Sequence, residues 1–140
     1  MLGRKDFTRD EIDRANAVID RQLDAYRALA ATTSGGAGEA ALAAFDPHFF
    51  DNLVLTLDRF FVHRVRAVSG KDANPLNEVE LLVESLLVGD TLRTNKVIKW
   101  VPENTVLGLA DGDPIALSEA QFTALADAFF AELESRFLPA

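Results

Sequence analysis

The sequence has no cysteine and only two histidines among its 140 residues. Without cysteine, the chain has no disulfide scaffold, no thiolate metal site and no cysteine nucleophile. A ferritin-like iron site needs a Glu-x-x-His motif, but phenylalanine stands three residues before both His48 and His63. The two histidines also lack the ligand spacing of a zinc site. We therefore expect no metal and no cofactor.

Long apolar runs are also missing. No segment approaches the roughly 18 uninterrupted apolar residues of a membrane span, and residues 1–7 carry no apolar core of a signal peptide. The net charge is −8, and only residues 59–99 are positive, with 7 basic and 5 acidic side chains. Because an acidic chain repels phosphates, we expect no nucleic-acid partner and no membrane. With no signal peptide and no membrane span in the sequence, the cytoplasm is the expected location. The positive middle third leaves room for a local anion site.

Four stretches have the apolar spacing and the capping residues of α-helices. The first runs from a capping box at Thr8 and Glu11 to about Thr32, the second from Asp46-Pro47 to about Val68, the third from Asn74-Pro75 to about Val88, and the last begins with a capping box at Ser118 and Gln121. The length and the 49% hydrophobic composition predict a single helical domain over residues 1–140, with residues 1–7 and 33–39 flexible.

The stretch between the third and last helices looks extended instead of helical. Residues 96–101 are rich in β-branched side chains, and the turn sequence Ala110–Asp113 stands between two short apolar runs. These signals predict a small β-hairpin. The expected fold is therefore mainly α, a compact bundle of about four helices with a small β-hairpin between the third and last long helices.

One charge falls within the apolar face of the second predicted helix. At about 100° per residue, Arg64 shares an arc with apolar residues that include Leu53, Phe60 and Phe61. A guanidinium in such a place needs a counter-charge, a ligand or a path to water. We expect Arg64 to face the interior and to be neutralised there.

Residues 63–78 place a helix end, a polar loop and a helix start close together. In one interpretation they form a binding site for a small anion, because free N–H groups at a helix start and nearby cations favour negative charge. The ligand-binding candidates are His63, Arg64, Lys71, Asn74, Asn77 and Glu78. In the other interpretation Arg64 is structural and caps the carbonyls of its own helix or pairs with Glu78, Glu80 or Glu84.

The second and third predicted helices each carry an extra apolar pair on their nominally polar side. These pairs are Leu55 with Val62 and Leu81 with Val88. Either both helices lie centrally in the bundle or the pairs form a subunit interface. Trp100 is a further candidate, as a lid over the bundle or as an anchor in a protein interface.

Three segments resemble a family of small uncharacterised helical proteins from actinobacteria. They are Asp51–Arg64, Gly70–Val79 and Ala128–Glu134, within a resemblance that covers roughly residues 45–137. The resemblance implies no known activity, so no residue receives a catalytic role from it. It implies only that the polar segment belongs to a family pattern.

The sequence therefore leaves three hypotheses of function. The first is a non-catalytic cytoplasmic helical protein that acts through self-association, as a homodimer, or through protein partners. The second is a binding module for a small anion or small molecule that uses residues 63–78. The third is an enzyme that uses Glu78 with His63, which requires the two side chains to lie within hydrogen-bond reach.

Overall fold

Five α-helices and one short 3-10 helix form the regular structure of residues 3–139, the part of the chain that the computed structural model describes. They are α1 (Arg9–Ala30), α2 (Gly36–Arg59), α3 (Arg66–Ser69), α4 (Pro75–Leu86), η1 (Pro102–Asn104) and α5 (Glu119–Phe137). The prediction of a mainly helical fold is confirmed. Residues 1–2, which belong to the stretch 1–7 expected to be flexible, lie outside the described residues.

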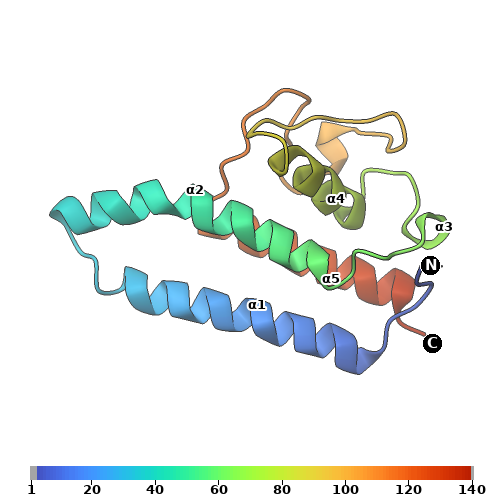
Figure 1. Ribbon diagram of the computed structural model, residues 1–140, viewed down its shortest axis with the longest axis horizontal. Helices are drawn as coiled ribbons and strands as arrows, with labels where there is room; N and C mark the ends of the chain where they lie inside the picture. Colours follow the sequence, from blue (N-terminus) through green and yellow to red (C-terminus); the bar gives the residue numbers. More distant parts are fainter. Residues whose placement is uncertain (1–2, 140) are drawn as a thin grey trace.

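The four long helices pack around one apolar core. α1 and α2 form an antiparallel pair, α5 lies along both of them, and α4 packs against α2 and α5 (Figure 1). Each helix contributes fully buried side chains to the core, among them Ile12 and Ile19, Phe50 and Leu57, Leu76 and Leu82, and Phe122 and Phe129. Burial of each such side chain contributes about 1.5–3 kcal/mol to stability.

The predicted helix caps are present at three of four starts. Thr8 and Glu11 exchange both hydrogen bonds of a capping box before α1, and Ser118 and Gln121 do so before α5. The side chain of Asn74 accepts hydrogen bonds from two backbone N–H groups at the start of α4. These side chains bind N–H groups that have no partner inside a helix, which fixes where each helix begins.

The predicted bounds of the second helix are wrong at both ends. α2 begins at Gly36 instead of Asp46, because alanines and other helix-forming residues precede Pro47. The helix continues through Pro47, although this proline removes one hydrogen bond and its ring crowds the carbonyl four residues earlier. Residues 36–39, expected to be flexible, therefore belong to α2. The helix ends at Arg59 instead of Val68, where the chain turns and the Phe61 N–H donates to the Asp58 carbonyl at 2.9 Å. Beyond the turn the backbone binds the N-terminal segment: the Arg4 N–H donates to the His63 carbonyl at 2.6 Å, and the Arg4 carbonyl accepts from the Val65 N–H at 2.9 Å.

The predicted β-hairpin is also wrong, since residues 3–139 contain no strand. The segment after α4 forms only isolated bridges, such as that between Thr91 and Pro114. Its backbone N–H groups bind side chains instead of a neighbouring strand: those of Val97 and Ile98 bind the side chain of Asn95, and that of Thr94 binds Asp111. A backbone donor already bound in this way is not available to a ladder.

Candidate functional site

The guanidinium of Arg64 lies inside the protein, just after the end of α2. Its side chain is 4% exposed, and Nη2 lies 3.1 Å from Oδ1 of Asp58. Nη1 donates to the carbonyl of Phe61 at 2.9 Å, and Nη2 also donates to that of Leu76 at 3.3 Å. The guanidinium carbon stands 5.5 Å from the ring centre of Phe129. The expectation of a buried, neutralised arginine is therefore confirmed.

The counter-charge is Asp58, not one of the three glutamates that the structural interpretation proposed. Asp58 precedes Arg64 by six residues, a spacing that would not bring the two side chains together on one continuous helix. They meet because α2 ends and the chain turns between them. Burial raises the pKa of Asp58, and nearby Glu80 adds to this, while the charge and hydrogen bond of Arg64 act in the opposite direction.

Asn74 and Asn77 hold the loop before α4 in place. Asn74 Nδ2 donates to the Ser69 carbonyl at 2.8 Å, while its Oδ1 caps the helix. Asn77 is fully buried, and its Nδ2 donates to the carbonyls of Gly70 and Asp72 at 3.1 and 2.8 Å. The amides of both asparagines are thus engaged within the chain.

Glu78 is a second buried carboxylate, and it binds backbone instead of a cation. The residue is 1% exposed, and its two oxygens accept hydrogen bonds from the N–H groups of Val106 and Leu107, at 2.7 and 2.9 Å. Burial raises its pKa, and the two backbone hydrogen bonds oppose that rise. Glu78 therefore fastens the long segment between α4 and α5 to the core.

The two remaining candidates of residues 63–78, His63 and Lys71, are exposed. Among residues 3–139 no hydrogen bond joins Glu78 to His63, so the condition for the enzyme hypothesis is not met in this structure. Arg66, which the sequence analysis did not select, donates to Asn77 Oδ1 at 2.8 Å and pairs with Glu80. The polar segment is thus tied together mainly by its own side chains.

A hollow of about 340 Å³ lies over the Arg64–Asp58 pair. Its lining includes the carboxylates of Asp58, Glu80 and Glu84 but only one cation, Arg64. Carboxylates around a single, already paired guanidinium repel an anion. The rest of the lining is apolar and comes from Val62, Val83 and Leu87.

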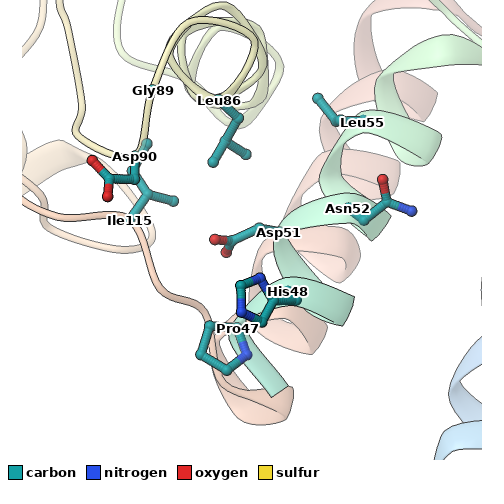
Figure 2. Close-up of a pocket in the computed structure, with 9 residues that line it drawn as sticks. All are labelled: Pro47, His48, Asp51, Asn52, Leu55, Leu86, Gly89, Asp90 and Ile115. Atoms are coloured by element: carbon teal, nitrogen blue, oxygen red, sulfur yellow. The ribbon is translucent and has the colours of Figure 1, made fainter. Parts of the chain in front are cut away.

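A second hollow, of about 390 Å³, opens further along the contact of α2 with the end of α4 (Figure 2). Figure 2 shows His48 and Asp51 on the α2 wall, with Leu86 and Ile115 across from them. Burial raises the pKa of Asp51. The hydrogen bond that Asp51 accepts from the Leu117 N–H at 3.0 Å and the nearby His48 both act to lower this pKa, but burial outweighs them. The polar side chains in the lining are those of His48, Asp51, Asn52 and Asp90, and the rest of the lining includes Leu55, Leu86 and Ile115.

The interface candidates occupy different environments. Leu81 is fully buried by the chain itself, and Leu55 is half-buried in the hollow of Figure 2. Trp100 is also half-buried, and its indole N–H donates to the Leu109 carbonyl at 2.8 Å. Val62 and Val88 are exposed. Of the five candidates, Val62 and Val88 are therefore the two most exposed to solvent, at 43% and 68%.

Two further observations bear on the class of protein. Between residues 3 and 139, no cluster of three or more histidine or acidic side chains is placed to hold a metal ion. Within the same residues, no helix has the length and apolar character needed to cross a membrane.

No family model, curated protein or solved structure matches the chain, so the resemblance to the actinobacterial family stays a prediction.

Proposed function

We propose that this protein is a non-catalytic cytoplasmic protein that acts by self-association, as a homodimer. Two kinds of observation support the proposal. The buried polar side chains that the sequence offered as a ligand site are engaged with the chain itself. Large apolar side chains, by contrast, are left exposed in groups.

The exposed apolar side chains carry the proposal. One group lies where α1 and α2 meet their connecting loop and includes Leu29 and Phe45, both lining one apolar groove. The other group, which we call the α2–α4 edge, consists of Val62 and Leu87, which line one hollow, and Val88, which follows Leu87 in the chain. Contiguous apolar surface is costly in water, and in natural proteins it marks sites of protein association.

Sedimentation velocity of the full chain over a wide concentration range tests the proposal. We expect a species of twice the 15.3 kDa chain mass that dissociates on dilution. A chain that sediments as a monomer at every concentration would contradict self-association.

Binding of a small anion by residues 63–78 stays the alternative. Lys71 is the exposed cation of that segment, and it stands close in sequence to the start of α4. A thermal-shift series with phosphate and small carboxylates tests it, with Lys71→Ala as the matched variant. Stabilisation by an anion that Lys71→Ala abolishes would support this alternative, and no stabilisation by any anion would contradict it.

A further inference from the structure

The end of the α1–α2 pair projects beyond the rest of the molecule. Figure 1 shows the end of α1 and the start of α2 extending past α4 and α5. We call residues 28–45 the tip. Between residues 31 and 45 no residue is buried, and only Thr33 and Leu42 are half-buried. The tip is therefore a helix pair without a covering layer.

The tip carries an apolar groove between its two helices. The groove has a volume of about 340 Å³, and Leu29, Leu42 and Phe45 line it together with the small residues Gly38 and Ala41. Leu29 is 52% exposed and Phe45 is 44% exposed. Small residues beside exposed large ones allow another helix pair to approach closely and to bury the large side chains.

The tip is nearly free of charge in a strongly acidic chain. Glu39 is its single charged residue, whereas the whole chain has a net charge of −8. The carboxylate of Glu39 also folds back onto its own helix start, where Oε2 accepts a hydrogen bond from the Gly35 N–H at 2.9 Å. A contact between two tips therefore brings together only one carboxylate from each copy, and that carboxylate is already bound to its own helix start.

The α2–α4 edge, unlike the tip, has several carboxylates beside its apolar side chains. Its Val62 and Leu87 line the same hollow as Asp58, Glu80 and Glu84. A twofold contact places the same surface of both copies face to face, so it would confront those carboxylates with their copies. Like-charge contacts of this kind disfavour pairing.

We propose that the second copy of the chain binds at the tip, so that two α1–α2 pairs meet groove to groove. This inference rests on the proposed self-association and specifies its surface. The Leu29 and Phe45 side chains of each copy fill the apolar groove of the other, and the four helices form a bundle across a twofold axis.

Sedimentation of two matched variants of the full chain tests the surface. Ala41→Glu places a charge in the groove at an exposed, helix-compatible position, and Val88→Glu adds the same charge at the α2–α4 edge. We expect Ala41→Glu to raise the dimer dissociation constant roughly tenfold or more and Val88→Glu to leave it near the wild-type value. Circular dichroism of each variant confirms that the helices are intact.

The outcomes separate the inference from the proposed function. A wild-type chain that is monomeric at all concentrations overturns both. A dimer that withstands Ala41→Glu, or that is weakened equally by the two variants, overturns the tip and leaves self-association standing.

Cross-linking gives an independent readout, because the chain has no cysteine of its own. Ala41→Cys and Val88→Cys each supply one thiol for a short bismaleimide. We expect covalent dimers from Ala41→Cys in preference to Val88→Cys. Equal yields from the two variants would contradict the tip as the contact.

Discussion

Arg64 and Asp58 form an ion pair with a 3.1 Å N–O distance, although their side chains are only 4% and 10% exposed. Removing one member leaves the other as an uncompensated charge in the interior. We expect Arg64→Met to lower the free energy of unfolding by about 3–5 kcal/mol at neutral pH, measured by urea denaturation. The exposed Arg59→Met serves as control and should change stability by less than about 0.5 kcal/mol.

The double variant distinguishes loss of the pair from loss of packing. Adding Asp58→Leu to Arg64→Met removes the stranded carboxylate, so the double variant should be more stable than Arg64→Met alone. Stability of Arg64→Met should also recover as the pH falls. Burial raises the pKa of Asp58, and Arg64→Met removes the charge that opposes this rise. The folded variant therefore takes up a proton on Asp58 at a higher pH than the unfolded variant does, so acidification stabilises the folded state. A flat pH dependence would contradict this account.

Glu78 is expected to hold the backbone around Val106 and Leu107 in its folded position. Glu78→Gln keeps the size of the side chain but replaces one of the two accepting oxygens by an amide donor, which then faces a backbone N–H. We expect a loss of about 1–3 kcal/mol in unfolding free energy. Amide hydrogen exchange should speed up at residues 106 and 107 first, while Glu103→Gln, at an exposed position, should leave those rates unchanged.

Gly70 cannot be replaced without strain. Its φ is +75°, and an added Cβ would stand 2.9 Å from Nη1 of Arg136 and 3.0 Å from Oδ1 of Asp72. We expect Gly70→Ala to lower the unfolding free energy by roughly 1–3 kcal/mol. Gly89→Ala is the matched control, since nothing lies within 4 Å of its added Cβ, and an equal loss in both variants would rule out this explanation.

The capping box of α1 should make stability depend on pH. The hydrogen bond from Arg4, and then that from the Thr8 N–H, lower the pKa of Glu11 from 4.5 to about 2. The stabilisation is present above pH 4.5 and is lost as the pH falls toward 2, where the folded state also binds the proton. The stability difference between wild type and Glu11→Gln should therefore shrink across this range. Asp20→Asn, outside the ion pairs of residues 3–139, should show no such trend.

Local rules predicted the helix starts at Thr8, Asn74 and Ser118, because a capping side chain acts within three residues of itself. The same rule failed at Asp46-Pro47. A proline is favourable at a helix start, whereas within a helix it removes a hydrogen bond and crowds the carbonyl four residues earlier, yet α2 continues through Pro47. Sequence alone did not separate these two cases.

The candidate site was predictable in part. The misplaced charge of Arg64 indicated a buried guanidinium, since an arginine among apolar side chains must be neutralised. Its partner was not predictable from helical spacing, because Asp58 reaches it only across the turn that follows α2. The hairpin prediction failed for a related reason: Glu78, 28 residues before Val106 in the chain, binds backbone that β-propensity had assigned to a ladder.

The N-terminal segment ends beside the last turn of α5, where the Phe7 N–H donates to the Phe137 carbonyl at 2.8 Å. The tip lies at the opposite pole of the molecule (Figure 1). Dimers joined at the tips would be elongated rods, with the start of α1 and the end of α5 of each copy at the two distant poles. Dyes attached near the loop after α1 should therefore show more efficient energy transfer between copies than dyes attached at the start of α1.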